Sequence, residues 1–585
     1  METQQMEKYR HTLAHLLGAA VLELYPGSKL TLGPAIEDGF YYDIDVEGKI
    51  SEDDLKNIEK KMSDLLKSWD SFSHKEVSQE EALEVYKDNE YKKELIQEIG
   101  ERGEKITLYT SGDFTDLCRG GHLENPKQEI QKGSWKLDRI SGAYWRGSEK
   151  NKMLTRIYGI AFESNEKLKE FEEMRREAEK RDHRKIGQEQ KLFFIDEMVG
   201  KGLVMWQPNG TIIRDEVEKL AVQKEASGGY KRVVTPHLAK KELFLTSGHL
   251  PYYEEDMYPK MEMDDGTYYL KAMNCPHHHI MYRHEPRSYR DLPLRLAEYG
   301  TVYRNERSGT LAGLLRVRGL CMNDAHIYCR KDQIKSEFEA ALRLTMEYFE
   351  IFGLKDYWFR LSKWDPNKKE KYIDEPENWD FTENEIRNLL VEMGVKFVEA
   401  EDEAAFYGPK VDIQFKSVIG RTETMSTVQL DFAAKKRFEL TYKDDKGEEN
   451  GDVFVIHRAP LSTHERFIAF LIEHYGGTWP IWLSPRQVNI IPIGENESSY
   501  AHEVRDILSS KNIRVEIDES SDSLGKKIRN SKISKTPYTL VIGQKEVEDK
   551  SVTVEKRGEE KGEVLKLEDF VKMIEEKIIT RDNNL

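Results

Sequence analysis

The chain has 585 residues, which is too long for one hydrophobic core and predicts about four domains. Charged residues make up 34% of it and hydrophobic residues 38%, a balance typical of a folded globular protein and not of a disordered one. The formal net charge of -17 excludes a protein that attracts nucleic acid through its overall charge, so any RNA contact needs local basic patches.

The first predicted element is a helix within residues 13–25, an apolar stretch interrupted by His15 and Glu23. It is too short and too polar to span a membrane, and no cleavage site follows it, so we expect an amphipathic helix and no membrane partner. The cysteines show no dense pairing pattern, which favours a reducing compartment: Cys118, Cys275, Cys321 and Cys329. We therefore expect a cytoplasmic protein.

The pattern of residues changes three times along the chain. Residues 1–162 alternate short apolar runs such as FYYDI and RIYGIAF with Gly and Pro, which predicts an α+β domain. Residues 163–191 are rich in charges of both signs and predict a helical linker. Residues 192–485 contain strand-like runs such as KVDIQF and TVQLDF, and residues 486–585 alternate short strands with helices. The last two segments predict a large sheet with helices packed on it and a small α/β domain with a partly parallel sheet.

Two pairs of metal-binding or catalytic side chains lie in the first domain. His11 and His15 are four residues apart, as are Cys118 and His122 in DLCRGGH, so each pair can lie on one face of a helix. Together they can form a metal site or a metal-free hydrolytic pocket, and such a pair can also be purely structural.

Arginines cluster in RLAEYGTVYRNERSGTLAGLLRVRG, which predicts a strand, a loop and a second strand. The guanidinium fork suits bidentate phosphate binding, so this unit is a candidate triphosphate clamp, although a solvated charged hairpin would have the same composition. A helical HERFIAFLIEHYGG, with Arg466 beside an apolar face, favours the clamp.

Cys275, His326 and His457 lie far apart in the sequence, so their spacing cannot show that they meet. A single cysteine or histidine of this kind more often packs in a protein core than binds a metal ion.

Three motifs resemble those of the class II aminoacyl-tRNA synthetases: Pro236 after a strand-like run, YRNE around Arg304 and Glu306, and HERF around Arg466. The resemblance implies an antiparallel-sheet catalytic core that binds ATP with Mg²⁺. It also implies that Arg304 holds the α-phosphate, Glu306 the adenine amino group, Arg316 the triphosphate and RNA end, and Arg466 the γ-phosphate. A homodimer through the segment around Pro236 is implied as well.

Within this class the chain resembles the threonyl-tRNA synthetases, in which a Cys, His, His set like Cys275, His326 and His457 binds one Zn²⁺ per subunit. The resemblance implies activation of L-threonine and its transfer to tRNA(Thr), with valine rejected because it lacks the hydroxyl group. The resemblance also implies that Asp324, Tyr407 and Met322 lie near threonine. Gln429 and His249 match family positions near the reacting phosphate and the RNA terminus, and His249 is a candidate for the transfer step.

RHTLAH, DLCRGGH and GAYWRG resemble the editing domain of bacterial-type threonyl-tRNA synthetases. A zinc site cannot exclude the smaller serine efficiently, so a second, hydrolytic site is expected. The resemblance implies that this site clears mischarged seryl-tRNA without a metal, and its candidate residues are His11, His15, Asp116, Cys118 and His122.

The last domain resembles the anticodon-binding domain of several class II synthetases, with Glu546 at a base-reading position. The chain departs from the family pattern at Met322, where Gln is common, at Ser426 and Ser462, at Gly121, and at Glu555, where an Arg is expected. The small domain that often precedes the editing domain is expected to be missing. Two alternatives stay open: a class II synthetase for another amino acid, and a synthetase-like regulatory protein that binds tRNA.

Overall fold

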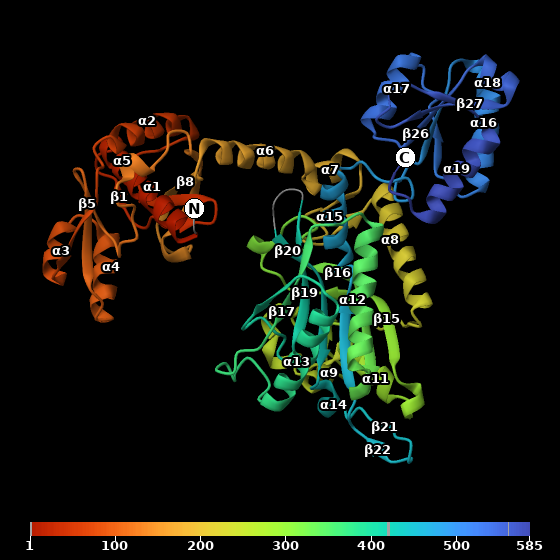
Figure 1. The fold of residues 1–585 in the computed structure, drawn as a ribbon, viewed down its shortest axis with the longest axis horizontal. Helices are drawn as coiled ribbons and strands as arrows, with labels where there is room; N and C mark the ends of the chain where they lie inside the picture. The colour runs from red at the N-terminus through yellow and green to blue at the C-terminus, as the bar shows by residue number, and fades with distance from the viewer. Residues whose placement is uncertain (1–2, 418–421, 560, 585) are drawn as a thin grey trace. The chain divides into compact units, whose positions relative to one another are not determined.

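The computed structural model describes residues 3–417, 422–559 and 561–584, and the chain divides into two compact units, Met1–Arg176 and Glu177–Leu585. The boundary lies inside α6 (Asn165–Arg181), which α7 (His183–Glu189) follows (Figure 1). These two helices account for most of the segment that the charge pattern predicts as a helical linker. No helix in the part of the chain that the structure describes is both long and apolar enough to cross a membrane.

The first unit is built around α1 (Thr3–Leu24) and a sheet in the order β1-β3-β8-β7, with β2 paired to β3. A second sheet has the order β4-β5-β6. Their bounds are β1 Lys29–Leu30, β2 Ala35–Ile36, β3 Gly39–Asp45, β4 Ser73–Val77, β5 Ile106–Ser111, β6 Phe114–Leu117, β7 Trp135–Tyr144 and β8 Met153–Ala161. The other helices of this unit are α2 (Leu55–Leu66), α3 (Gln79–Val85), α4 (Glu90–Glu101) and α5 (Pro126–Glu129).

The expectation that the first helix is amphipathic is wrong. Every residue from Thr12 to Val21 is buried, because α1 packs against α2 and also against strands β2, β3 and β8. His15, which interrupts the apolar run, is buried with its neighbours instead of facing solvent, and Glu23 pairs with Lys61 near the helix end. A helical stretch that is buried on all sides, as Thr12 to Val21 is, needs no polar face.

Residues 192–485 of the second unit contain an eight-stranded sheet in the order β11-β15-β16-β23-β20-β19-β17-β18. All neighbouring strands are antiparallel except the two outer pairs, β11 with β15 and β17 with β18. The strands are β11 Lys231–Arg232, β15 Leu294–Tyr303, β16 Gly319–Cys329, β17 Tyr357–Ser362, β18 Phe397–Ala400, β19 Lys410–Lys416, β20 Thr422–Asp431 and β23 Phe454–Ala459. The antiparallel core that the resemblance implies is confirmed.

Helices cover this sheet, and smaller strands extend the domain (Figure 1). Helix α12 packs on β16, β20 and β23, and α15 packs on β16 and on α7 and α8. The helices are α8 Pro208–Ser227, α9 Lys241–Ser247, α10 His249–Tyr252, α11 Cys275–Arg283, α12 Ile334–Ile351, α13 Pro376–Glu392, α14 Ala434–Arg437 and α15 His464–Tyr475. The smaller strands are β9 Phe193–Phe194, β10 Met205–Trp206, β12 Leu238–Lys240, β13 Met261–Met263, β14 Gly266–Leu270, β21 Tyr442–Lys443 and β22 Glu449–Asn450.

The C-terminal sheet has the order β25-β24-β26-β27-β28. Its first three strands are parallel and the rest antiparallel, as the sequence predicts for a partly parallel sheet. The elements are β24 Val488–Pro492, α16 Ser498–Ser510, β25 Val515–Ile517, α17 Leu524–Ile533, β26 Tyr538–Ile542, α18 Gln544–Asp549, β27 Ser551–Lys556, β28 Glu563–Lys566 and α19 Leu567–Thr580.

Candidate functional site

A cavity of about 290 Å³ lies over the central strands of the large sheet. Side chains expected at the catalytic site line it together: His249, Cys275, Arg304, Met322, Asp324, His326, Tyr407, Gln429 and His457. Met322, Asp324 and His326 alternate along β16 and so project to one face of the sheet. The strand register places His457 opposite both His326 and Gln429.

Cys275, His326 and His457 bring one ligand atom each to within 4.8 Å of one another. Cys275 begins α11, and burial raises the pKa of its thiol well above the usual range, so the free thiol is protonated and would lose its proton on binding a metal ion. The second nitrogen of each imidazole is engaged, because His457 Nε2 lies 3.1 Å from an Asp431 oxygen and His326 Nδ1 lies 2.8 Å from His278. Burial keeps the pKa of His326 well below its usual range, so its ring is neutral and offers a lone pair. The residues present fit a three-coordinate divalent metal site.

Asp324 and His249 occupy different parts of the same cavity. Asp324 accepts a hydrogen bond of 3.1 Å from the Asn274 amide, and burial raises the pKa of its carboxyl group. His249 Nδ1 lies 2.7 Å from the Ser247 hydroxyl, while its buried Nε2 has no protein partner among the described residues. Burial, followed by the charge of His457, lowers the pKa of His249 to about 4, so this imidazole is neutral at physiological pH. The Tyr407 hydroxyl is hydrogen-bonded to Gln429.

Three of the expected ATP-binding side chains do not line the cavity: Glu306, Arg316 and Arg466. Arg316 Nε donates to Glu306 at 2.8 Å, so two groups expected to hold different parts of ATP are paired with each other. Arg466 donates to Glu423 at 3.1 Å. All three belong to segments that flank the sheet, so their convergence on one nucleotide stays a prediction.

The two serines that depart from the family pattern have distinct environments. The Ser426 hydroxyl donates to the Ala459 carbonyl oxygen at 3.1 Å, which ties β20 to β23. Ser462 has a φ of 53°, the left-handed region that favours glycine and costs other residues about 1–2 kcal/mol.

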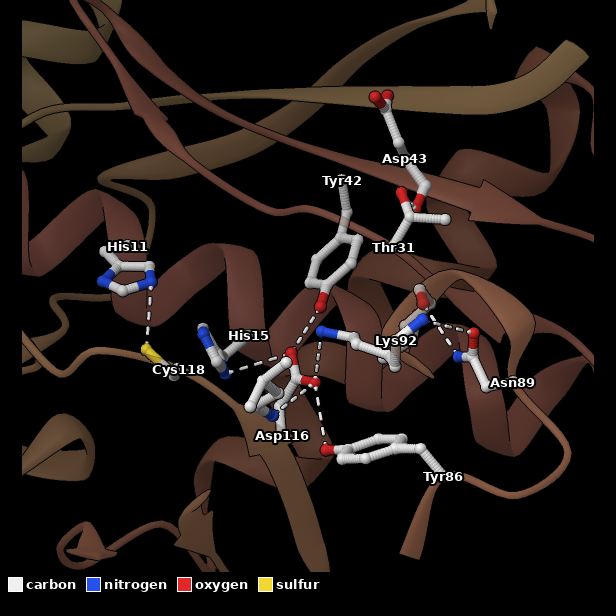
Figure 2. Close-up of polar contacts among 12 residues, drawn as sticks. His11, His15, Thr31, Tyr42, Asp43, Tyr86, Asn89, Lys92, Asp116 and Cys118 are labelled. Atoms are coloured by element: carbon white, nitrogen blue, oxygen red, sulfur yellow. Dashed lines mark hydrogen bonds and ion pairs between the residues drawn. The ribbon is translucent and has the colours of Figure 1, made fainter. Parts of the chain in front are cut away.

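A second cavity, of about 370 Å³, lies in the first unit (Figure 2). His11, His15, Asp116 and Cys118 line it, and the Cys118 sulfur lies 3.6 Å from His11 Nε2 and 3.3 Å from His122 Nε2. The ring of His122 stacks on that of His11, with 4.5 Å between centroids. Each of the four predicted side chains His11, His15, Cys118 and His122 brings one ligand atom to within 4.8 Å of the others. These distances fit either a metal site or a metal-free pocket.

The expectation that Cys118 and His122 share a helix face is wrong. Strand β6 ends at Leu117, and residues 118–123 form a loop. Gly120 and Gly121 have φ values of 90° and 85°, which no right-handed helix contains. The loop still turns both side chains toward His11.

Burial is the main influence on the ionisation of this pocket. It lowers the pKa of His122 to about 2 and places the pKa values of His11 and His15 below their usual range. It also raises the pKa of Cys118 to about 11. The pocket therefore offers neutral imidazoles and a thiol at physiological pH.

Asp116 is surrounded by residues that the sequence did not indicate (Figure 2). Lys92 Nζ lies 2.6 Å from one carboxylate oxygen and the Tyr42 hydroxyl donates to the other at 2.5 Å, while Tyr86 approaches at 3.4 Å. Tyr42 lies in the FYYDI strand and Lys92 in a charged helix, and neither carries a local signal of function. These contacts fix Asp116 beside His15, whose Nδ1 is 3.9 Å away.

In the C-terminal domain, the Glu546 carboxylate accepts hydrogen bonds from residues of the same domain. One carboxylate oxygen accepts from the Gly543 N–H at 2.9 Å and the other from the Thr553 hydroxyl at 2.8 Å. Glu555 lies on β27 opposite Thr539. Base reading by Glu546 therefore stays a prediction.

Comparisons with known proteins agree on one family. The family models matched are the tRNA synthetase class II core domain (G, H, P, S and T) at residues 259–475, the anticodon binding domain at 487–577, and the threonyl and alanyl tRNA synthetase second additional domain at 106–158. Threonine–tRNA ligase of Geobacillus sp. (strain WCH70) is 48% identical over 97% of this chain and 88% of its own length. The same enzyme of Staphylococcus aureus (strain bovine RF122 / ET3-1) is 46% identical over 97% and 88%.

A solved structure is similar as well. The crystal structure of the RNA binding domain of threonyl-tRNA synthetase from Cryptosporidium parvum Iowa II matches with a TM-score of 0.65 and 35% identity, covering 68% of this chain and 98% of that one. Neither a class II synthetase for another amino acid nor a regulatory tRNA-binding protein is favoured by these relatives. With its class II core, its anticodon-binding domain and its second additional domain, the chain belongs to the threonine–tRNA ligases.

Proposed function

We propose that the cavity over the large sheet is where this threonine–tRNA ligase activates L-threonine with ATP to threonyl-adenylate and then transfers it to tRNA(Thr). The observation that carries the proposal is the convergence of the expected side chains, from Arg304 to His457, on one cavity. The threonine carboxylate attacks the α-phosphorus and pyrophosphate leaves, so positive charge from Arg304, Arg466 and a Mg²⁺ bound with ATP stabilises the transition state. The terminal hydroxyl of tRNA then attacks the threonyl carbonyl group and AMP leaves, with His249 the candidate group that assists transfer.

Zn²⁺ is the metal we propose for Cys275, His326 and His457. Thiolate and imidazole ligands suit it, and three protein ligands leave an open coordination position. Such an ion can bind the amino and hydroxyl groups of threonine, and valine lacks the second of these. Asp324, which lies two residues before His326 on the same face of β16, would accept a hydrogen bond from the threonine hydroxyl.

Threonine-dependent exchange of pyrophosphate into ATP tests this assignment. Exchange should run with threonine, weakly with serine, and hardly with valine or proline. Arg304→Ala should lower it by about 100-fold or more, since one lost electrostatic contact to the transition state costs about that much. Purified protein should contain one zinc per subunit, and Cys275→Ala should remove it. Exchange that prefers another amino acid would contradict the proposal.

For the cavity of the first unit we infer hydrolysis of mischarged seryl-tRNA. Its support is a set of neutral imidazoles beside the Asp116 carboxylate, which suits positioning a water molecule and the RNA end. The double variant His11→Ala, His15→Ala should accumulate seryl-tRNA while threonine-dependent exchange stays unchanged. Clearance of seryl-tRNA at the original rate would rule this pocket out. Zinc analysis of the Cys275→Ala protein decides between the metal-bound and metal-free alternatives for this pocket, because any ion that remains must be held elsewhere.

Further assignments follow from family membership and are part of the proposal: a homodimer through the segment around Pro236, anticodon contacts in the last domain that include Glu546, and a cytoplasmic location. Val234, two residues before Pro236, is 81% exposed, as an interface residue would be in a single subunit. Sedimentation of the full chain should give twice the subunit mass, and Val234→Glu should reduce it to the subunit mass.

A further inference from the structure

A second histidine stands behind the proposed metal ligand His326. His326 Nδ1 lies 2.8 Å from Nδ1 of His278, and His278 Nε2 lies 3.1 Å from an oxygen of Glu298. The three side chains are 1%, 0% and 3% exposed. His278 is the middle residue of the His277, His278, His279 run on α11, and Glu298 lies on β15, the strand next to His326. Neither lines the cavity, so neither is placed to touch threonine or ATP.

The chain of hydrogen bonds has one direction when both rings are neutral. The Glu298 carboxylate only accepts, so Nε2 of His278 carries the proton and donates it. Nδ1 of His278 is then a lone pair, and His326 must donate to it through its own Nδ1. This arrangement leaves the lone pair of His326 at Nε2, which is the form in which an imidazole binds a metal ion.

Glu298 is itself held from several sides. The Thr235 N–H donates to it at 2.7 Å and the Thr235 hydroxyl at 2.9 Å, while Lys271 Nζ lies 3.5 Å away. Lys271 also donates to the Thr235 hydroxyl at 2.9 Å. Lys271 and Thr235 are 0% and 3% exposed, so water does not compete for these contacts. A carboxylate with this many donors keeps one orientation.

We propose that His278 and Glu298 are positioning residues that fix the tautomer and ring orientation of His326 for metal binding. The inference rests on the proposed zinc site. The other ligand, His457, reaches its carboxylate Asp431 directly, and that carboxylate accepts from the Ala433 and Ala434 N–H groups at 2.7 and 2.9 Å. The two ligand imidazoles are thus oriented by separate carboxylates, one direct and one through an added histidine. Thr235 directly precedes Pro236, so the segment that resembles the first class II motif is hydrogen-bonded to Glu298.

Zinc affinity of the full chain tests the proposal. In competition with a chromophoric zinc chelator, His278→Ala should bind zinc about 10- to 100-fold more weakly than the original protein. The KM for threonine in pyrophosphate exchange should rise, while the KM for ATP should stay unchanged because Arg304 and Arg466 are untouched.

Two conservative variants separate positioning from packing. His278→Asn keeps an acceptor at the place of Nδ1, next to His326, whereas His278→Gln reaches Glu298 but offers His326 nothing. Zinc affinity should therefore recover in His278→Asn and not in His278→Gln. Thr235→Val removes the hydroxyl contacts of Glu298 and keeps the N–H contact, so it should weaken zinc binding less than His278→Ala does.

His277→Gln is the matched control. His277 is on the same helix and is 7% exposed, yet neither ring nitrogen has a hydrogen-bond partner among the described residues. This variant should bind zinc as the original protein does.

The outcomes separate this inference from the proposed function. Zinc that depends on Cys275 but binds equally well to His278→Ala would overturn the inference and leave the zinc site standing. Original protein without zinc would overturn the zinc site itself. If His278→Ala fails to fold, equal zinc affinities of His278→Asn and His278→Gln would still overturn the inference.

Discussion

Burial keeps several histidines neutral, both in the two cavities and elsewhere in the fold, and this has a consequence for stability. The pKa is lowered to about 4 for His249 and to about 3 for His464, whereas a histidine in an unfolded chain has a pKa of about 6.5. Above pH 6.5 neither state binds the proton. Below it the unfolded chain binds protons that the folded chain excludes, so the free energy of unfolding falls as the pH falls toward these lower values.

We therefore predict acid destabilisation that begins near pH 6.5. Each such histidine contributes a loss of up to about 1.4 kcal/mol per pH unit until the folded pKa is reached. His464→Asn removes one of these groups, so its urea midpoint should fall less steeply between pH 6 and pH 4 than that of the original protein. Parallel curves for the two proteins would contradict the pKa assigned to His464. Carboxylates contribute equally to the pH dependence of both proteins. The difference between the two urea midpoints at each pH therefore reports on His464 alone.

Elements of the fold bring distant functional residues into register. His326 and His457 face each other because β16 and β23 pair at those positions, and a slip of one residue would turn one imidazole to the other face of the sheet. In the first unit, α1 carries both His11 and His15 and is buried along most of its length. The stability of that helix and the geometry of the pocket are therefore coupled.

We predict that Leu17→Ala damages editing and spares activation. Leu17 is 0% exposed within the core of the first unit, and such a truncation costs about 2–5 kcal/mol. Calorimetry of the full chain should show the transition of the first unit at a lower temperature, and seryl-tRNA should be cleared more slowly. Leu342→Ala, equally buried on α12, should instead lower the transition of the second unit. A shift of both transitions by Leu17→Ala would show that the units do not unfold separately.

At the scale of the whole molecule, the two units divide the proposed activities, and the segment that joins them contacts a loop that is expected to bind ATP. His183, at the start of α7, has Nδ1 2.8 Å from Glu473 and accepts the Leu314 N–H at 3.1 Å through Nε2. Leu314 lies in the arginine-rich loop after β15, and Glu473 lies on α15. The predicted linker therefore helps to hold the loop that is expected to contact ATP.

Two truncations test this division. A chain of residues 177–585 should keep threonine-dependent exchange and lose the clearance of seryl-tRNA. A chain of residues 190–585 lacks His183 and α7, so its exchange rate should fall by about 10-fold or more, equivalent to roughly 1.4 kcal/mol. Equal exchange by the two truncated proteins would show that His183 does not position the loop.

The sequence alone determined the family, the order of the domains and most candidate site residues. Arg304, Glu306 and Arg466 stand in short local motifs, and the strand and helix patterns of the last domain are periodic, so both can be recognised without knowing which residues meet. The helical expectations for residues 13–25 and for Cys118 with His122 were wrong in part, because burial on all sides and two left-handed glycines are not visible in spacing.

Only the tertiary structure decided which distant groups converge. It brought Cys275, His326 and His457 together and surrounded Asp116 with Tyr42, Tyr86 and Lys92. It also placed His278 and Glu298 behind a proposed metal ligand. These contacts join residues on different strands and helices, and their strength comes from burial, which excludes water and is a property of the packed fold rather than of any local stretch of sequence.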